Sequence, residues 1–454
     1  MLGAVPAPPL FHPDFQPLPY WWEAWRPSTG EEEALPRQTR IAVIGAGYAG
    51  LAAALELART GIEVTVLEAG LPGGGASTRN GGAVSGGVNV GKSFTGRRHA
   101  LLPERRRALL GAASDAFGLV DTLIARENIA CFWEKRGRFV GAFTPAHYRA
   151  LEERLDALND DAASGARMLP RSRQHEEIAS DYYYGGMIVE RSGKLHPALY
   201  FKGLLEACRR QGVPVVAKAE VLRILNDPTL PRDRTWRLET ARGVIAASEV
   251  IIATNGYTGE IAPTLRRRLI PVASHIIATE ELPEDLARTL IPNGRTISDT
   301  PRVLTYYRMS PDGRRLIFGG RARFTLVDPT VAAPILHRFM THRFPQLRET
   351  RITHAWSGNV AFTFDALPHM GRENGMHYCL GCNGSGIAMM TYLGWQTARK
   401  IASGANRASA FDQENFPDFP FYRGNPWFLP LIGGLFRFRD ARDRRRAGAD
   451  GAGS

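Results

Sequence analysis

The chain has 454 residues, too many for one simple core, and therefore predicts two domains or one large α/β unit. Its composition, 44% hydrophobic and 22% charged, is ordinary for a globular protein, but its formal net charge of +12 is high. The arginines are spread in short runs, whereas a nucleic-acid-binding protein usually concentrates such charge and interleaves it with aromatic residues. We interpret the charge mainly as solvated surface, with attraction of acidic substrates or of a membrane as the alternative.

Cysteine usage and the lack of membrane signals bear on location. Four cysteines, Cys131, Cys208, Cys379 and Cys382, do not make a disulfide framework in so long a chain, which favours a reducing compartment. The proline-rich N-terminus is not a signal peptide, and no run approaches the roughly 18 apolar residues that span a bilayer. We therefore expect a soluble, cytoplasmic protein.

Residues 1–38 predict an arm rather than a folded domain. Prolines prevent a helix there, yet Tyr20, Trp21, Trp22 and Trp25 need somewhere to be buried. We expect the arm to lie across the main body or across a neighbouring subunit.

Residues 39–68 predict a dinucleotide-binding βαβ unit, in which an apolar strand, a glycine turn and an Ala/Leu-rich helix follow one another. In such a unit Gly45 permits the tight turn, Gly47 lets the backbone approach a pyrophosphate, and Gly50 lets helix and strand pack closely. Glu68, at the end of the second strand, is placed to accept hydrogen bonds from a ribose. The helix N-terminus adds free N–H groups and positive dipole for the phosphates.

The following segments suggest a cofactor loop, a helical region and then strands. Residues 73–82 are rich in glycine and suited to wrapping a ligand, and residues 100–170 look helical without a strand signal. Strands are predicted at 186–190, 213–216, 220–225, 236–240, 250–253 and 352–362, and helices at 197–211 and 331–344. Residues 270–325 alternate apolar and polar, as in an antiparallel sheet.

The chain ends with a second glycine unit and a tail. A strand at 378–380 enters a glycine turn at 381–386 and a helix at 387–401. The tail from residue 405 places an apolar stretch beside arginines, which could give weak contact with a membrane surface. Its prolines and glycines argue against a good amphipathic helix, so docking on the protein itself is favoured, and residues 447–454 are expected to be disordered.

Three features favour FAD over NAD. The glycine-rich stretch after Glu68 has no role in a simple NAD domain but could enclose a longer, buried cofactor. The strand at 250–253 ends in small residues, as a second contact with a dinucleotide requires. The glycine unit at 381–386 returns to the nucleotide fold near the other end of the chain, which indicates a discontinuous cofactor domain with an inserted substrate domain.

Further motifs occur in a characteristic order: Ala76-Ser-Thr-Arg-Asn-Gly-Gly82, Gly193-Lys-Leu-His-Pro197, Ala253-Thr-Asn-Gly-Tyr257, Tyr307-Arg-Met-Ser-Pro-Asp-Gly313 and Val360-Ala-Phe-Thr-Phe-Asp-Ala-Leu-Pro-His369. Over nearly the whole chain they resemble the D-amino-acid oxidase and sarcosine oxidase family of FAD-dependent amine oxidoreductases, especially its gamma-glutamylputrescine oxidoreductase-like members. The resemblance implies an α/β fold with a discontinuous Rossmann-like FAD-binding domain and an inserted α+β substrate domain on a mixed or antiparallel sheet. The expected boundaries are 1–38 for the arm, 39–100, 195–260 and 350–404 for FAD binding, 101–194 and 261–349 for substrate, and 405–454 for the tail.

The resemblance also implies which residues hold the cofactor. They are Gly45, Gly47, Gly50 and Glu68 at the pyrophosphate and adenosine ribose, Ser77, Arg79, Asn80, Gly81 and Gly82 at the ribityl chain and flavin ring, Val221 at the adenine, and Gly381, Gly384, Gly386 and Ile387 at the pyrimidine side of the flavin.

The implied activity is oxidation of a C–N bond of an amine or amino acid, in which a hydride passes to the flavin and the resulting imine is hydrolysed. No metal is needed for this chemistry. The alternatives are an FAD-dependent dehydrogenase of another small donor, or a non-catalytic flavin-binding partner subunit. Flavin reduction by an amine would exclude the non-catalytic alternative.

Substrate contacts are expected from Tyr306, Tyr307 and Arg308, since alternate side chains of their strand must face the pocket. Arg308 could pair with a substrate carboxylate or make an ordinary surface salt bridge. His196 could line the pocket or cap the helix that follows it.

Two departures from sarcosine oxidases affect the cofactor and the electron acceptor. Some relatives attach flavin through a cysteine where this chain has Val360, so non-covalent FAD is expected. Others use a lysine on the strand at 315–319, which contains none, so either oxygen or another electron acceptor stays open. Cys379 and Cys382 have the spacing of a redox pair, but we favour a packing role in the glycine turn.

Overall fold

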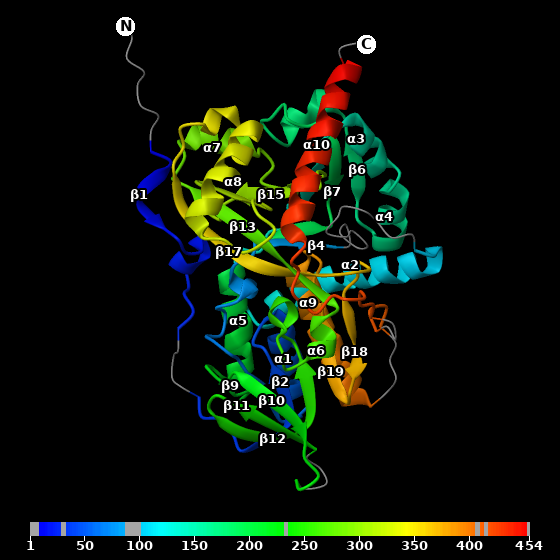
Figure 1. Ribbon diagram of the computed structural model, residues 1–454. Helices are drawn as coiled ribbons and strands as arrows, with labels where there is room; N and C mark the ends of the chain where they lie inside the picture. The colour runs from blue at the N-terminus through cyan, green and yellow to red at the C-terminus, as the bar shows by residue number, and fades with distance from the viewer. Residues whose placement is uncertain are drawn as a thin grey trace.

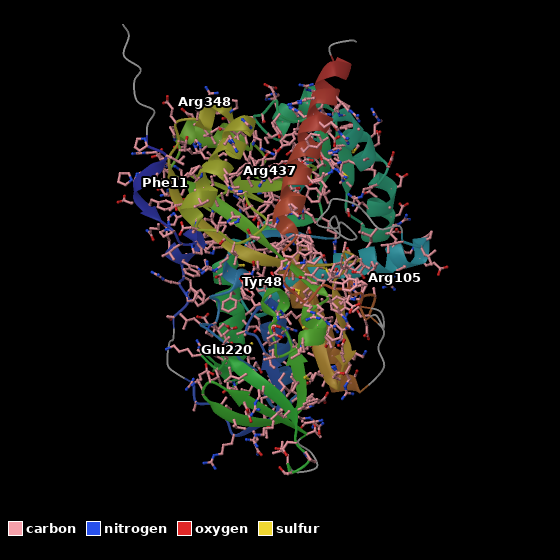
Figure 2. All side chains as sticks on the ribbon, viewed as in Figure 1. Phe11, Tyr48, Arg105, Glu220, Arg348 and Arg437 are labelled. Atoms are coloured by element: carbon pink, nitrogen blue, oxygen red, sulfur yellow. The ribbon has the colours of Figure 1, made fainter. Side chains whose placement is uncertain are left out.

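The computed structural model describes residues 9–28, 33–86, 101–230, 235–404, 409–412 and 416–451. Figure 1 shows a lower part built on one sheet and an upper part built on a second, larger sheet, with α2 and α9 between them. The chain crosses between the two parts several times, as expected for a discontinuous cofactor domain. Tyr48, at the start of α1, lies where the parts meet (Figure 2).

The lower part contains the nucleotide sheet, with strand order β10-β11-β12-β2-β3-β9 and with β19 joining β12 to β18. Its strands are β2 (Gln38–Ile44), β3 (Val64–Leu67), β9 (Val215–Val216), β10 (Val221–Asn226), β11 (Trp236–Thr240), β12 (Gly243–Ile252), β18 (His369–Glu373) and β19 (Met376–Leu380). Strands β12, β2, β3 and β9 run parallel to one another. Residues 41–44 are an unbroken apolar run because both faces of this central strand are buried.

Helices cover the nucleotide sheet and fill the space towards the larger one. They are α1 (Tyr48–Arg59), α2 (Pro103–Arg126), α5 (Pro197–Arg210) and α9 (Gly386–Ser403). By length and composition α2 could cross a membrane, but Leu109, Phe117 and Val120 are buried in the same core as α9. A core helix of a soluble protein passes the same test, so the packing accounts for the apolar content of α2.

The upper part contains the substrate sheet, with strand order β1-β17-β13-β16-β15-β14-β5-β7-β6. Its strands are β1 (Phe11–Gln16), β5 (Arg138–Gly141), β6 (Ala166–Leu169), β7 (Gly186–Val189), β13 (Leu269–Thr279), β14 (Thr296–Asp299), β15 (Thr305–Met309), β16 (Leu316–Gly320) and β17 (Ile352–Thr363). The antiparallel pairing predicted for residues 270–325 is confirmed, because β13, β16, β15 and β14 are successive antiparallel neighbours. The parallel pairs β14–β5 and β1–β17 make the sheet mixed.

The remaining helices belong mainly to the upper part, and a short ribbon joins the two parts. The helices are α3 (Pro145–Glu152), α4 (Leu155–Ala162), α6 (Pro263–Arg266), α7 (Glu284–Leu290), α8 (Pro329–Arg343) and α10 (Leu429–Gly451), and the ribbon is β4 (Ala83–Ser85) with β8 (Ser192–Lys194). Leu290 and Leu336 of α7 and α8 pack with Phe318 on one face of the substrate sheet. The other face is left for the nucleotide part.

Three expectations need correction. Residues 100–170 contain two strands, β5 and β6, which pair with β14 and β7. Each strand is too short to show a clear alternation of apolar and polar residues, so the sequence does not predict it. Residues 352–363 lie in the substrate sheet rather than with the FAD-binding segments, because β17 pairs with β13 along its length. Helix α2 packs in the nucleotide core rather than in the substrate domain. Residues 87–100, assigned to the first FAD-binding segment, lie outside the described residues.

The tail docks on the substrate part, as favoured from the sequence, but it does so as a helix. Pro430 stands in the first turn of α10, where the missing N–H costs no hydrogen bond. The Oδ2 atom of Asp440 accepts a 2.9 Å hydrogen bond from the Val303 backbone, and Arg444 donates to the Phe143 carbonyl at 2.8 Å. The helix continues to Gly451, so disorder from residue 447 is not observed, and residues 452–454 lie outside the description.

Candidate active site

The predicted glycine turn forms between β2 and α1. Gly45 has a φ of +103°, which glycine adopts without strain, and its N–H donates to the Leu67 carbonyl at 2.8 Å. A Cβ on Gly50 would overlap the Gly45 carbonyl oxygen, so the helix reaches the strand only because residue 50 is glycine. Gly47 is the N-cap residue of α1, and a Cβ there would meet only Ser77 Oγ, at 3.3 Å. The turn thus leaves space for a pyrophosphate against the helix N-terminus.

Glu68 stands beside this turn at the end of β3. Its Oε2 atom accepts a hydrogen bond from Ala46 N at 2.9 Å, and its Oε1 atom accepts one from Gly70 N at 3.0 Å. Backbone donors therefore fix the carboxylate in place. An ionised carboxylate has further lone pairs, so Glu68 can also accept hydrogen bonds from ribose hydroxyls.

The glycine-rich segment 73–82 folds as a loop against the start of α1. Ser77 Oγ accepts a 3.2 Å hydrogen bond from Tyr48 N, which is one of the unpaired donors of the helix N-terminus. Asn80 closes the loop on itself, because its Nδ2 atom donates to the Ser77 carbonyl at 2.8 Å and its Oδ1 atom accepts from Gly82 N at 2.9 Å. The loop is therefore ordered by its own polar side chains.

The N-terminal arm holds this loop from outside. Trp21 donates from Nε1 to the Asn80 carbonyl at 2.8 Å, and Trp22 donates to Thr78 Oγ1 at 2.9 Å. The Arg79 guanidinium lies over the Trp22 ring, 4.6 Å from its centroid. For its described residues, the expectation that the arm lies across the main body is confirmed: Phe11–Gln16 join the substrate sheet as β1, and Trp21 and Trp22 contact the cofactor loop.

The second glycine unit brings the far end of the chain to the same place. Helix α9 begins at Gly386, and its N-cap residue Ser385 makes no side-chain capping hydrogen bond. The first N–H groups of this 18-residue helix and its positive dipole end are therefore available to a ligand. Gly384 has a φ of +83°, and a Cβ there would meet nothing within 4 Å, so the turn is open towards this end of the helix.

A cavity of about 1220 Å³ runs along all these segments and continues over the substrate sheet. Most of the expected cofactor residues border it: Gly45, Gly47, Glu68, Ser77, Arg79, Asn80, Gly81, Val221, Gly384, Gly386 and Ile387. Gly50, Gly82 and Gly381 stand behind the lining and shape the backbone that carries it. For example, Gly381 N donates to Asn255 Oδ1 at 2.9 Å, which ties the second glycine unit to the end of β12.

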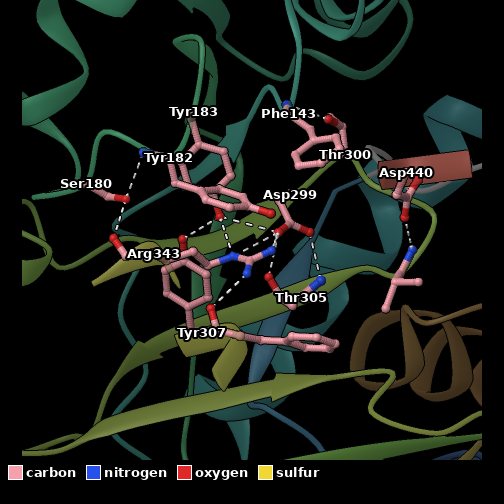
Figure 3. Close-up of polar contacts among 12 residues, drawn as sticks. Phe143, Ser180, Tyr182, Tyr183, Asp299, Thr300, Thr305, Tyr307, Arg343 and Asp440 are labelled. Carbon is pink, nitrogen blue, oxygen red and sulfur yellow. Dashed lines mark hydrogen bonds and ion pairs between the residues drawn. The ribbon is translucent and has the colours of Figure 1, made fainter. Parts of the chain in front are cut away.

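The two tyrosines of β15 point to opposite faces of the substrate sheet. A Cβ on Gly81 would lie 2.8 Å from the Tyr306 ring, and Tyr306 OH lies 2.8 Å from Ser274 Oγ, another residue of the cavity wall. Tyr307 instead stacks on Phe318, and its OH lies 2.7 Å from Tyr183 OH in a buried network on the other side (Figure 3). Tyr306, rather than Tyr307, therefore presents its ring to the cofactor loop.

Arg308 borders the cavity on the same face as Tyr306, but its hydrogen bonds go to the backbone. It donates to the Met309 carbonyl at 3.0 Å, to the Leu195 carbonyl at 2.7 Å and to the Gly82 carbonyl at 3.4 Å. Its Nη2 atom is buried without a hydrogen-bond partner in the described part of the chain. Burial lowers its pKa to about 10, so it stays a cation at neutral pH. These contacts tie the substrate sheet to the cofactor loop.

His196 takes the capping role that the sequence left open. Its Nδ1 atom accepts a hydrogen bond from Leu199 N at 3.3 Å, at the start of α5. Its ring packs edge-on against Trp21, with 4.9 Å between centroids, and does not border the cavity. Burial, assisted by the Arg308 charge, lowers the pKa of His196 to about 4. The ring is therefore neutral at pH 7 and can offer a lone pair to the helix.

The cysteines of the second glycine unit are free. Cys379 Sγ contacts the Ile252 carbonyl at 3.9 Å, whereas Cys382 Sγ contacts the Ala361 carbonyl at 3.6 Å. Burial raises the pKa of the Cys379 thiol to about 12, which leaves it protonated and unreactive at neutral pH. These contacts agree with a packing role.

Sequence reasoning missed the part of the cavity that lies beyond β15. Polar and charged side chains of β5, α3, the link between α3 and α4, β14 and the chain after β14 border it: Arg138, His147, Arg154, Thr296, Ser298 and Thr300. The sequence does carry one signal, because the charged Arg138 stands at the start of the otherwise apolar segment 138–142. As long as β5 is not recognised as a buried strand, however, this arginine is interpreted as surface charge.

Comparison with known proteins identifies the class of this fold and site. The family model described as FAD dependent oxidoreductase, DAO, matches residues 40–400. The chain therefore belongs to the DAO family of FAD-dependent oxidoreductases.

Individual relatives cover most of the chain. It is 31% identical over 407 residues to the gamma-glutamylputrescine oxidoreductase of Escherichia coli strain K12, covering 89% of this chain and 92% of the relative. The crystal structure of glycine oxidase from Geobacillus kaustophilus superposes with a TM-score of 0.69 at 20% identity, over 85% of this chain and 99% of that one. L-proline dehydrogenase from P. horikoshii gives a TM-score of 0.69 at 18% identity, over 83% and 97%. The two structural matches confirm the expected fold.

The residues present fit FAD, the cofactor of this family. The space above Gly47 would take a pyrophosphate, Glu68 would take a ribose, and the N-terminus of α9 would face an acceptor edge of the flavin ring. The cavity joins these three places without interruption. The protein is accordingly an FAD-dependent oxidoreductase.

Proposed function

We propose that this protein oxidises the C–N bond of an amine or amino acid, and that its substrate is a gamma-glutamylated amine. The observation that carries the proposal is the continuity of one cavity from the cofactor segments to the aromatic face of the substrate sheet. The 31% identity to a gamma-glutamylputrescine oxidoreductase supports the choice of substrate. FAD, when bound, supplies the hydride acceptor, and the imine that forms is hydrolysed by water.

The protein's own groups prepare the substrate and the acceptor edge. Tyr306, with its ring against Gly81 and its pKa raised to about 12 by burial, forms an uncharged wall where the reacting carbon would lie. A wall of this kind disfavours an ammonium ion and so favours the neutral amine that can release hydride. The N–H groups at the start of α9 would stabilise negative charge on the pyrimidine side.

Arg308 acts in this proposal as a positioning residue. Its bonds to Leu195 and Gly82 hold the substrate sheet at a fixed distance from the cofactor loop. The capping contact of His196 supports the same wall, and so does Tyr307, which borders the cavity while its ring packs on Phe318 at the opposite face of the sheet.

We further propose that FAD is held without a covalent bond and that the electron acceptor is oxygen or another oxidant. Val360 borders the cavity where some relatives place a cysteine, and the described residues that border the cavity include no lysine. The absence of a lysine favours slow reaction with oxygen.

Anaerobic flavin bleaching tests the proposed function. The purified holoenzyme is mixed with gamma-glutamylputrescine, putrescine, sarcosine and D- and L-amino acids, and absorbance near the flavin maximum is followed. We expect bleaching by the gamma-glutamylated amine and slow recolouring in air. Bleaching by none of these amines would contradict the proposal, and bleaching by amino acids alone would replace its substrate class.

We also propose a cytoplasmic location with weak contact to anionic membrane surfaces. Four free cysteines support a reducing compartment. Leu431, Leu435 and Phe438 form an exposed stripe on α10 beside Arg442, and such a stripe can enter a lipid interface. Cosedimentation with phosphatidylglycerol vesicles at low salt should exceed that with phosphatidylcholine vesicles, and it should fall in the double variant Leu431→Ser/Phe438→Ser. Equal sedimentation with both lipids would reject the contact.

A further inference from the structure

The cavity has a part that the cofactor segments do not account for. Beyond β15 it is bordered by β14, by β5 and by α3, all of which belong to the substrate part of the molecule. The lining there includes charged and polar side chains, whereas the wall at Tyr306 is aromatic. A ligand that fills the whole cavity would therefore place an uncharged end near the flavin and a polar end over β5.

Arg138 is a buried charged group at this polar end. Its side chain is 92% removed from solvent, since the residue is only 8% exposed, and its Nε atom donates to Ser298 Oγ at 2.9 Å. In the part of the chain that the structure describes, no ion pair joins Arg138 to a carboxylate. Burial lowers its pKa to about 10, which still leaves it positively charged at neutral pH. A buried cation with only a neutral hydroxyl as partner is strongly stabilised by an anion.

The acidic groups near this end do not fill that role. Asp299, the acid whose charge acts on Arg138, is bound by Arg343 through a 2.6 Å ion pair on the other side of β14 (Figure 3). Glu153, just after α3, borders the cavity but is exposed to solvent. Among the described residues Arg138 therefore has no counter-ion of its own, and an anionic ligand group would supply one.

Strand geometry gives the distance between the two ends. The Arg138 side chain reaches Ser298 on β14, which pairs with Tyr306 on β15, whereas the Tyr306 ring lies over its other partner, Gly319 on β16. Two strand spacings separate β14 from β16, which is roughly 10 Å. An extended chain of about three residue lengths, or roughly nine bonds, spans that distance. The carboxylate of an α-amino acid is one bond from the carbon that is oxidised, so it cannot reach Arg138 from the flavin.

We propose that Arg138 binds a carboxylate that lies at the far end of an extended amine substrate, remote from the oxidised carbon. This inference rests on the proposed function and deepens it, because it makes Arg138 the specificity-determining residue. The favoured substrates are amines with a distal carboxylate, such as gamma-glutamyl amides of diamines. Amines of equal length without the carboxylate, and short α-amino acids, are disfavoured.

Calorimetric binding to the anaerobic holoenzyme, with its flavin reduced beforehand by dithionite, tests this proposal independently of turnover, because reduced flavin cannot accept hydride. The probes are gamma-glutamylputrescine and N-(4-aminobutanoyl)putrescine, which have the same chain and differ only in the distal carboxylate. Wild type should bind the first more tightly. Arg138→Met should raise its Kd by roughly 10- to 100-fold and leave the Kd of N-(4-aminobutanoyl)putrescine within about 2-fold. Arg138→Lys should recover part of the lost affinity because it restores the charge.

Controls separate this outcome from a general defect. Arg167→Met removes an exposed arginine of the same sheet and should change neither Kd. FAD content and thermal midpoint should be the same in Arg138→Lys as in wild type, which keeps the comparison valid if Arg138→Met folds poorly. Equal loss for both probes, or no binding of gamma-glutamylputrescine to wild type, overturns the proposal. Carboxylate-dependent binding without flavin reduction would sustain it and reject the proposed oxidation instead.

Discussion

Replacing Gly47 by leucine is expected to give a folded protein that purifies without FAD. Gly47 has φ −82° and ψ −173°, a conformation open to any residue, so the substitution introduces no backbone strain. A Cβ there points to Ser77 Oγ at 3.3 Å, into the space that the pyrophosphate requires. The remaining leucine atoms would fill that space, and we expect FAD affinity to fall by at least about 1000-fold, since both the phosphate contacts and the helix dipole are lost. Absorbance of the purified protein and FAD titration measure the effect.

Gly47→Ala is the matched control for this experiment. Its single extra carbon makes only the Ser77 contact, so FAD affinity should fall by about 10-fold or less and the protein should stay yellow. A Gly47→Leu protein that carries a full complement of FAD would show that the cofactor does not lie in this turn. Circular dichroism and the thermal midpoint establish that both variants are folded.

Asp299→Ala is expected to have the largest effect on stability. Asp299 is fully buried, and one carboxylate accepts hydrogen bonds from Arg343 Nη2 at 2.6 Å, from Thr305 N at 2.7 Å and from Thr305 Oγ1 at 2.6 Å (Figure 3). Its removal leaves the Arg343 guanidinium buried without its counter-ion. Loss of one partner of a buried pair costs roughly 3–5 kcal/mol of unfolding free energy. Thermal or denaturant unfolding at saturating FAD measures it.

Two further variants show whether the cost arises from the pair itself. Asp443→Ala removes a carboxylate that binds Arg302 nearer the surface, and it should cost about 1 kcal/mol or less. Asp299→Ala/Arg343→Met should cost less than the sum of its single substitutions, because the second change removes the stranded charge. Because Asp299 lies on the face of the sheet away from the cofactor loop, FAD affinity should not change. Similar losses for Asp299→Ala and Asp443→Ala would contradict the assignment.

The cofactor turn could be predicted from sequence because its physics is local. Gly45 is required by its φ of +103° and Gly50 by its contact with the Gly45 carbonyl, and Glu68 follows at the end of the next strand. In the strand–glycine–helix unit at residues 381–387, Gly381 and Gly384 likewise have positive φ values. Such backbone requirements leave a mark in the sequence whatever the distant segments do.

The substrate end could not be predicted in the same way, because it depends on register between distant strands. Tyr306 and Tyr307 lie on opposite faces of the substrate sheet, and the pairing of β15 with β16 and β14 decides which of them faces the cofactor loop. That Arg138 borders the cavity becomes evident only once β5 is known to pair with β14. For His196 both roles are open at the level of sequence, and only the 3.3 Å contact with Leu199 N decides between them.

The pocket for FAD is assembled from Gly45 near one end of the chain and Ile387 near the other. During synthesis the ribosome must add most of the polypeptide after the first of these residues before the last emerges. At about 5–20 residues per second this takes tens of seconds. Throughout that interval the glycine turn can already form, but its cofactor would remain open to solvent on the side that α9 later covers. Tight retention of FAD is therefore possible only after nearly the whole chain has been synthesised. In cells short of the cofactor, we expect full-length protein with an open cleft to accumulate, rather than nascent chains that already carry FAD.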